Sequence, residues 1–197
     1  MITNHIILAA AWTCYCILHS LLASIWFKGK AQNLLKDGYR HYRLFYALFA
    51  FIGFVVIILF QVSIVSPPLY KVTMTSKIIG GIIGLTGLVI MLFCIKKYFM
   101  QLSGLKELIQ NRTANELMIT GIHKKVRHPL YAGTFIFIWG LMVFFPYPSL
   151  LIANIIITTY TLIGIRFEEN KLEKEFGAAY KKYKKEVPML IPKFSQR

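Results

Sequence analysis

Long apolar blocks are the feature of this sequence that most limits its fold. Five stretches are apolar over most of their length and are expected to be helices: residues 6–27, 44–65, 78–95, 129–145 and 149–165. A helix needs about 20 apolar residues to cross a hydrocarbon core about 30 Å thick. The apolar fraction of 56% also exceeds that of ordinary soluble domains. The sequence therefore predicts an all-α integral membrane protein with about five transmembrane helices.

The first block differs from a cleaved signal peptide. The residues before it, numbers 1–5, contain no Lys or Arg, and its apolar run is longer than a signal peptide requires. We therefore expect it to be a transmembrane helix that is retained, with Trp26 and Phe27 at the membrane interface.

Lys and Arg are distributed unevenly between the connections, and the net charge is +15. Segment 28–43 holds five of them, segment 96–128 seven and the part after residue 165 nine, whereas the other two connections hold two and none. By the positive-inside rule, the basic segments are cytoplasmic, the N-terminus is outside and the C-terminus is cytoplasmic. The membrane is then a cell inner or plasma membrane, or an endomembrane. Because the positive charge follows this topology, it indicates anionic lipid as a partner and argues against nucleic acid.

The three cysteines, Cys14, Cys16 and Cys94, all lie inside apolar blocks. Their spacing fits neither a disulfide framework nor a metal site, so no metal is expected. We interpret all three as small buried apolar residues.

Three glycines of the third block, Gly80, Gly84 and Gly87, fall on one face of a helix. Small residues at this spacing let two helices approach closely in lipid. This interpretation is favoured over a passage for a cofactor.

Four polar residues, His19, Ser20, Gln61 and Asn154, lie inside apolar blocks. Polar groups are costly in a bilayer and are often functional there. The pair His19-Ser20 is more often a hydrogen bond between helices than a catalytic group, and a direct role for His19 stays open.

The first cluster of residues that could bind a ligand or take part in catalysis lies at the start of the fourth block. Arg127-His128-Pro129 is followed there by Tyr131. Proline suits the first turn of a helix, and the residue before it is extended. The N–H groups of this helix start favour an anion, and the planar fork of Arg127 suits a carboxylate. The cluster could therefore grip the carboxylate end of a zwitterionic cofactor. The alternative is an anchor, with Arg127 reaching lipid phosphate and Tyr131 in the interfacial belt.

A second cluster follows the fifth block, where Arg166 precedes Glu168 and Glu169. These carboxylates could accept hydrogen bonds from hydroxyl or amino groups, although a solvated helix start would look the same. Farther on, apolar residues recur at helical spacing, which predicts one amphipathic helix that folds back onto segment 96–128. The stripe consists of Leu172, Phe176, Tyr180, Tyr183 and Val187.

Together the two clusters resemble a known family. The elements Arg127-His128-Pro129-x-Tyr131 and Glu168-Glu169, followed by Phe176-Gly177, Tyr180, Tyr183 and Val187-Pro188, are separated by a two-helix hairpin. This pattern, over about the last 80 residues, resembles the isoprenylcysteine carboxyl methyltransferases, which are membrane-embedded and dependent on S-adenosylmethionine. Outside it, His19-Ser20 and the run 42–46 resemble bacterial relatives in the wider group.

The resemblance implies a pocket for S-adenosylmethionine at the cytoplasmic surface, completed by a C-terminal amphipathic helix, with a lipophilic substrate entering from the bilayer. Residues 1–95 would form an N-terminal three-helix region and residues 96–197 the cofactor-binding catalytic region. The family usually has an aromatic residue, commonly tyrosine, where this chain has His123. Carried over, the cofactor residues are His123, Val126, Arg127, His128, Tyr131, Glu168 and Glu169.

Methyl transfer from a sulfonium is an in-line displacement that depends mainly on alignment and on exclusion of water. A carboxylate acceptor needs no general base, a thiol needs modest help, and an amine would need His128 or Glu169. Arg166, which could steer an anionic substrate, and Glu169 are the predicted catalytic residues. The acceptor stays open between a prenylated cysteine, a phospholipid amine and a small thiol. A relative that binds without turnover and a small transporter are the other classes considered.

Overall fold

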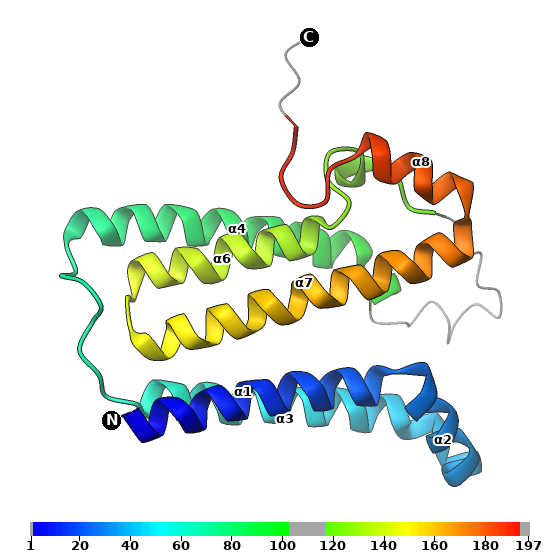
Figure 1. The fold of residues 1–197 in the computed structure, drawn as a ribbon, viewed down its shortest axis with the longest axis horizontal. Helices are drawn as coiled ribbons and strands as arrows, with labels where there is room; N and C mark the ends of the chain where they lie inside the picture. The colour runs from blue at the N-terminus through cyan, green and yellow to red at the C-terminus, as the bar shows by residue number, and fades with distance from the viewer. Residues whose placement is uncertain (1, 103–116, 194–197) are drawn as a thin grey trace. The chain divides into compact units, whose positions relative to one another are not determined.

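The computed structural model describes residues 2–102 and 117–193, and residues 37, 43 and 98–102 only by their backbone. Part of the expected cytoplasmic connection, with Lys106 and Arg112, lies outside these residues. In the described part of the chain, all regular structure is helical (Figure 1). The elements are α1 (Ile2–Ala23), α2 (Ile25–Leu35), η1 (Lys36–His41), α3 (Tyr42–Ser63), α4 (Met74–Leu102), η2 (Gly121–Lys124), α6 (Pro129–Phe144), α7 (Pro148–Phe176) and α8 (Ala178–Glu186).

The chain divides into two compact units. The first contains Met1–Lys71 and Pro146–Tyr160, and therefore α1, α2, η1, α3 and the first part of α7. The second contains Val72–Phe145 and Thr161–Arg197, and therefore α4, η2, α6, the remainder of α7 and α8. The predicted division into regions 1–95 and 96–197 concerns function and stays a prediction.

The core of the first unit joins α1 to α3 and to the beginning of α7. Its buried apolar residues lie on one side of each helix, as helices that pack against one another require. Inside this core the Trp12 indole N–H donates to the Gln61 side-chain oxygen over 2.9 Å. The buried apolar set comprises Leu8, Trp12, Ile57, Ile64 and Ala153.

The first apolar block is not one helix, as the sequence predicted, because it breaks at Ser24. The Ser24 side chain accepts a hydrogen bond from the Phe27 N–H, which caps the start of α2. Trp26 and Phe27 therefore begin a new helix, and the basic segment 28–43 is helical through α2 and η1. The block was expected to run on because a single Ser inside an apolar run is a weak stop signal.

In the second unit, α4 and α6 pack side by side at very short range (Figure 1). A Cβ added at Gly87 would lie 2.7 Å from the Gly133 carbonyl oxygen, and one added at Gly80 would lie 2.6 Å from the Phe144 nitrogen. A Cβ added at Gly140 would lie 2.7 Å from the Gly84 Cα, whereas one added at Gly84 would meet nothing closer than 3.9 Å. The packing interpretation of the glycine face is therefore confirmed, since only hydrogen fits between these backbones.

The C-terminal part of α7 continues well past the apolar block, and the predicted single C-terminal helix is wrong. Gly177 adopts φ 52°, in the left-handed region that favours glycine, and separates α7 from α8. The predicted apolar stripe is thereby divided, with Phe176 on α7 and Tyr180 and Tyr183 on α8. Both tyrosines are buried.

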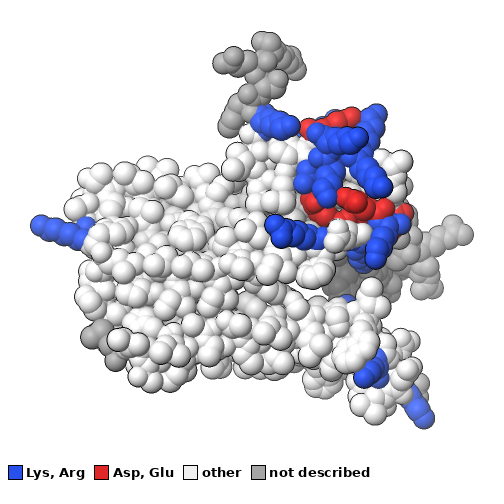
Figure 2. All heavy atoms as spheres, viewed as in Figure 1, with Lys and Arg blue, Asp and Glu red and all other residues white. Residues whose placement is uncertain are grey.

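Four helices of the described residues are long and apolar enough to cross a membrane, namely Ile2–Ala23, Gly38–Ser63, Met74–Lys97 and Pro148–Phe176. The fifth predicted span forms α6, whose 16 residues make it a shorter apolar helix. The chain is an integral membrane protein on this evidence, and the count of five stays a prediction. In the second unit, Lys, Arg, Asp and Glu gather over α8 and the end of α7, while the sides of α4 and α6 carry almost none (Figure 2).

The cysteines are all free thiols. Cys16 and Cys94 are buried, as predicted, but the prediction is wrong for Cys14, which lies on the exposed side of α1. Two residues apart on a helix, Cys14 and Cys16 face different directions, and only one of those faces is covered by α3 or α7 in the first unit.

Candidate functional site

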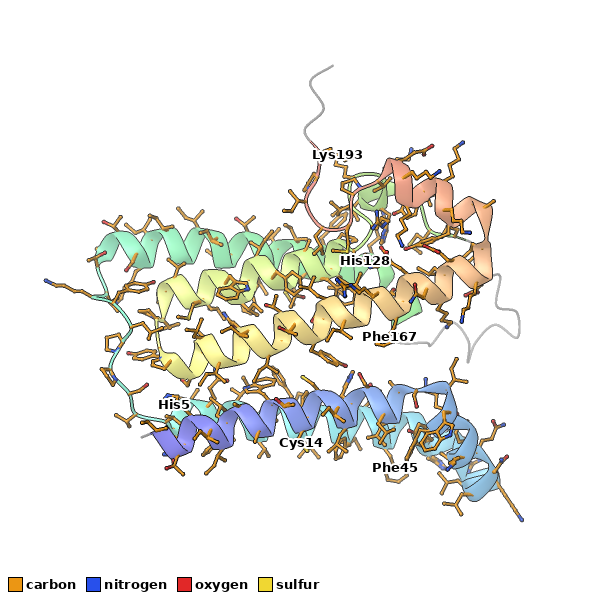
Figure 3. All side chains as sticks on the ribbon, viewed as in Figure 1. His5, Cys14, Phe45, His128, Phe167 and Lys193 are labelled. Atoms are coloured by element: carbon orange, nitrogen blue, oxygen red, sulfur yellow. The ribbon has the colours of Figure 1, made fainter. Side chains whose placement is uncertain are left out.

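The start of α6 positions the first predicted cluster. Pro129 is the first residue of the helix. His128 before it has φ −122° and ψ 66°, outside both the helical and the extended regions. The predicted place of Pro129 is confirmed, whereas the prediction of an extended His128 is wrong, because its ψ is too small for an extended residue. His128 and Pro129 are buried, and Figure 3 labels His128 where the start of α6 faces the second half of α7.

Glu169 on α7 is the centre of the site. Its Oε1 atom accepts hydrogen bonds from Arg127 Nε at 2.8 Å and lies 3.2 Å from His128 Nε2. Arg127 Nη2 also lies 2.8 Å from the same oxygen. The side chains of Arg127 and Glu169 are only 9% and 7% exposed, so this is a buried, charge-assisted pair. The two predicted clusters, 42 residues apart, are therefore in direct contact.

Lys184 on α8 adds a second positive charge to Glu169. Its ammonium lies 3.1 Å from Glu169 Oε2 and donates to Glu173 Oε1 over 2.8 Å. Sequence reasoning did not single out Lys184. A signal was present, because Lys184 lies four residues after Tyr180 and three before Val187, on the apolar stripe itself. A lysine on a buried face usually has an acidic partner.

The segment after α8 pairs with the residues before α6. The Arg127 N–H donates to the Pro188 carbonyl over 2.9 Å, and the His128 N–H donates to the Met189 carbonyl over 3.0 Å. The Arg127 guanidinium donates further to the carbonyls of Lys184, at 3.0 Å, and Val187. The carboxylate that Arg127 binds is thus the protein's own Glu169. The Arg127 guanidinium also holds the C-terminal segment in place.

Glu168, next along α7, has a different environment. Its side chain is 46% exposed, and its Oε2 atom accepts a hydrogen bond from the Tyr131 hydroxyl over 3.3 Å. His128 Nδ1 lies 3.9 Å from the same oxygen, and the rings of His128 and Tyr131 stack at 5.7 Å between centroids. Glu168 therefore presents an accessible carboxylate, with Tyr131 and the buried His128 beside it, next to the buried Arg127–Glu169 pair.

The other predicted site residues lie around this core or away from it. The His123 ring lies 3.1 Å from the Arg127 carbonyl oxygen, and its own carbonyl accepts from the Tyr183 hydroxyl over 2.7 Å. Val126 is buried. Arg166 is exposed, and no hydrogen bond or ion pair joins it to another described residue. The predicted role of Arg166 in steering an anionic substrate therefore stays a prediction.

Two titratable groups outside the spans are shifted by this environment. Burial lowers the pKa of His123 and outweighs the hydrogen bond to the Arg127 carbonyl, which raises it. The hydrogen bond to Glu173, followed by that to Glu169, raises the pKa of Lys184. Lys184 is therefore held as a cation beside Glu169, while His123, which does not contact Glu169, favours its neutral form.

The residues present fit the cationic part of S-adenosylmethionine. Glu168 offers an exposed carboxylate, and Tyr131 and His128 Nδ1 lie beside it, which suits an ammonium, a sulfonium or ribose hydroxyls. No group of three metal-ligating side chains occurs among the described residues. The exposed carboxylate of Glu168 could bind a cationic ligand, while the buried Arg127–Glu169 pair holds α7 against the residues before α6.

Comparison with known proteins assigns the family. Residues 4–187 match DUF1295, a family described as "Protein of unknown function". The chain belongs to the DUF1295 family. No solved structure matches this DUF1295 chain.

Curated relatives carry methyltransferase names. Methanethiol S-methyltransferase 2 of Bradyrhizobium diazoefficiens is 35% identical over 80 residues, which are 39% of this chain and 29% of that protein. The protein-S-isoprenylcysteine O-methyltransferase of Schizosaccharomyces pombe is 36% identical over 83 residues, or 41% and 35% of the two chains. That of Xenopus laevis is 30% identical over 139 residues, or 64% and 43%.

The resemblance to membrane methyltransferases of the isoprenylcysteine type is thereby confirmed, at modest identity. The matches span only about a third of the length of the methanethiol relative and less than half of the other two. The names of these relatives describe those proteins, and they differ in the acceptor that they name.

Proposed function

We propose that this protein is an integral membrane methyltransferase that uses S-adenosylmethionine and acts on a lipophilic acceptor. The observation that carries the proposal is the direct contact of the two sequence clusters through Arg127, His128 and Glu169, with Glu168 exposed beside them. The relatives named methanethiol S-methyltransferase and protein-S-isoprenylcysteine O-methyltransferase are both methyltransferases by name, which supports the proposal.

The cofactor would supply a methyl group on a sulfonium, ready for in-line displacement. His128, Tyr131 and Glu168 would hold its cationic and hydroxyl groups. Arg127 and Glu169 would fix the positions of the elements around the cofactor. Arg127 would bind Glu169 and the C-terminal segment rather than the carboxylate of the cofactor. His123 and Val126 would border the adenosine side, and α8 would complete the pocket. These roles belong to region 96–197.

The acceptor has two leading classes. The sequence pattern favours carboxyl methylation of an isoprenylcysteine-type substrate, and the methanethiol relatives favour a thiol equally. A phospholipid amine is the third. In each case the acceptor would enter from the bilayer, region 1–95 would shape its binding, and the topology would have the C-terminus cytoplasmic and anionic lipid around the basic segments.

The test is binding of S-adenosylmethionine to detergent-purified protein by calorimetry. Glu168→Gln keeps the shape of the side chain but removes its charge, and His128→Ala removes the ring. Each variant is expected to weaken binding about tenfold to a hundredfold, because each loses a hydrogen bond to a charged group. Glu186→Gln, an exposed acid at the end of α8, is the matched control and should bind like the wild type.

Absence of binding by folded wild-type protein would overturn the methyltransferase proposal. A membrane relative that binds another ligand or a partner without turnover would then be the leading alternative. Equal binding by the wild type and both site variants would leave the cofactor but reject this site.

A further inference from the structure

The two nitrogens of the His128 ring, in the second unit, have different surroundings. Nε2 lies 3.2 Å from Glu169 Oε1, within reach of a hydrogen bond. Nδ1 has no hydrogen-bonding partner among the residues that the structure describes, and Glu168 Oε2 lies 3.9 Å from it, too far for a hydrogen bond. The His128 side chain is only 6% exposed. An unpaired nitrogen on so buried a ring, beside a half-exposed carboxylate, indicates a place where a ligand can bind.

Glu169 decides which nitrogen of His128 carries the proton. Its Oε1 atom accepts from Arg127 Nε over 2.8 Å, and its Oε2 atom lies 3.1 Å from the Lys184 ammonium. With a cation on each oxygen, Glu169 is an ionised carboxylate, which only accepts hydrogen bonds. Its contact with His128 Nε2 therefore requires a proton on Nε2. In the neutral ring, Nδ1 is then a bare acceptor.

The same contacts leave Glu169 poorly placed to act as a general base. Its side chain is 7% exposed, and both of its oxygens are occupied by donors of the protein itself. Uptake of a proton by Glu169 would weaken its charge-assisted bonds to Arg127 and Lys184. Glu169 can therefore influence a ligand only through His128, which is the behaviour of a positioning residue.

His128 Nδ1 and Glu168 Oε2 then form a pair of neighbouring acceptors. The Tyr131 hydroxyl donates to Glu168 Oε2 over 3.3 Å, which identifies that oxygen as an acceptor. Two acceptors cannot satisfy each other, so a ligand that bonds to both must bring at least two N–H or O–H donors. A sulfonium has none, and ribose hydroxyls bring no charge to match the carboxylate. A primary ammonium has three donors and a positive charge, and therefore fits this pair best.

We propose that Glu169 fixes His128 as the tautomer with its proton on Nε2, so that His128 Nδ1 and Glu168 Oε2 together bind a primary ammonium group. This inference rests on the proposed function, because the ammonium would be that of the amino-acid part of S-adenosylmethionine. Arg127 and Lys184 hold Glu169, Glu169 orients His128, and His128 contacts the ligand. No proton is transferred on binding, so this subsite positions the cofactor.

The first experiment is nitrogen NMR of the full-length wild-type protein in detergent, with isotopically labelled histidine and at mildly alkaline pH. A bare imidazole nitrogen resonates well downfield of a protonated one, so the spectrum reports the tautomer directly. The His128 signals are those that His128→Ala lacks. Nε2 is expected to be protonated and Nδ1 bare. Adding S-adenosylhomocysteine, the cofactor without its methyl group, should move the Nδ1 signal upfield, because Nδ1 then accepts a hydrogen bond. A proton on Nδ1 in the ligand-free protein overturns the inference.

The second experiment compares two ligands by calorimetry. The deaminated analogue of S-adenosylhomocysteine has hydrogen in place of the amino group and keeps the ribose and the carboxylate. The wild type is expected to bind S-adenosylhomocysteine about a hundredfold more tightly than this analogue, because only the ammonium bonds to Glu168 and His128. Glu169→Gln can donate its amide to His128 Nε2 and no longer fixes the tautomer, so the preference should fall about tenfold. An equal preference in folded Glu169→Gln overturns the positioning role.

Glu173→Gln is the matched control, because it removes the other acid that Lys184 contacts and leaves Glu169 in place. It is expected to change neither the tautomer of His128 nor the preference between the two ligands. A loss of preference equal to that of Glu169→Gln would mean that any broken ion pair has this effect, and would overturn the inference. If Glu169→Gln does not fold, the wild-type spectrum and the wild-type ligand preference decide.

Failure of this inference is distinguishable from failure of the proposed function. The tautomer of His128 is read without any ligand, and S-adenosylmethionine binding is measured separately on the same preparations. Wild-type protein that binds S-adenosylmethionine but binds S-adenosylhomocysteine and its deaminated analogue equally overturns the ammonium subsite alone. Folded wild-type protein that binds none of these ligands overturns the proposed function.

Discussion

Both units place polar side chains between apolar helices, but they satisfy these side chains with different kinds of contact. In the second unit Glu169 collects Arg127, His128 and Lys184 into an ionic cluster near the end of α7. In the first unit the polar contacts between helices are hydrogen bonds rather than ion pairs: Trp12 donates to Gln61, and the His19 ring contacts the hydroxyls of Tyr46 and Tyr160.

The difference follows from where each cluster lies along its helices. A buried charge is tolerated only when it is paired and hydrogen-bonded, and the second unit has basic residues close at hand beyond the apolar blocks. Within a span, neutral groups satisfy one another at a smaller desolvation cost. The ionic cluster should therefore be sensitive to loss of a single partner, whereas the neutral contacts should tolerate it better.

The largest expected effect comes from Glu169→Leu. Arg127, Lys184 and His128 would lose their common acceptor, and a buried guanidinium would remain without its counter-ion. Breaking such a pair costs about 3–5 kcal/mol. Thermal unfolding of detergent-purified protein measures the loss, and Glu186→Gln serves as the control. A change below about 1 kcal/mol would mean that the cluster is solvated and that the comparison is wrong.

The next effect tests how tightly the second unit is packed. Gly87→Ala places a methyl group against the backbone of Gly133 and Phe137, whereas in Gly81→Ala the new carbon lies 3.8 Å from the Phe144 ring, an ordinary contact. Overpacking of this kind costs about 1–3 kcal/mol. The two alanine variants, compared by thermal unfolding, should differ by this amount, and equal stability would contradict the close approach of α4 and α6.

A smaller effect is expected for the neutral contact of the first unit. Gln61→Leu leaves the Trp12 N–H without its acceptor. Hydrogen bonds between membrane helices contribute about 0.6 kcal/mol on average, with a maximum near 1.7. A double-mutant cycle with Trp12→Phe isolates this coupling. A coupling as large as that of the Arg127–Glu169 pair would remove the distinction between the two units.

The smallest effects are those of pH on the second unit. The folded-state pKa of Lys184 is raised above its ordinary 10.5, so its contribution to stability is complete below that pH and is lost as pH rises through the folded value. The pKa of His123 is lowered from 6.5, so stability falls as pH drops below about 6.5. Lys184→Met should flatten the alkaline dependence and His123→Gln the acidic one. An unchanged slope in either variant would contradict the assignment to that residue.

Sequence reasoning anticipated those parts of the site that depend on local rules. Pro129 at a helix start and the glycine face of α4 follow from sterics and spacing within a few residues. The two clusters were also expected to meet, because an apolar stripe after residue 170 had to pack on something. The helix breaks at Ser24 and Gly177 were missed, since one serine or glycine inside a strong periodic pattern rarely ends a helix by itself.

The sequence by itself determined that this is a helical membrane protein, because apolar blocks of that length have few other stable states. It also singled out the two residue clusters that the structure brings into contact. Only the tertiary structure decided their partners. Arg127 was predicted to face a ligand carboxylate, and the fold instead gives its donors to Glu169 and to the C-terminal segment. His19 was one polar residue among several, and three helices meeting around it made it the centre of a hydroxyl cluster. Pairing depends on distances across helices, which local periodicity does not encode.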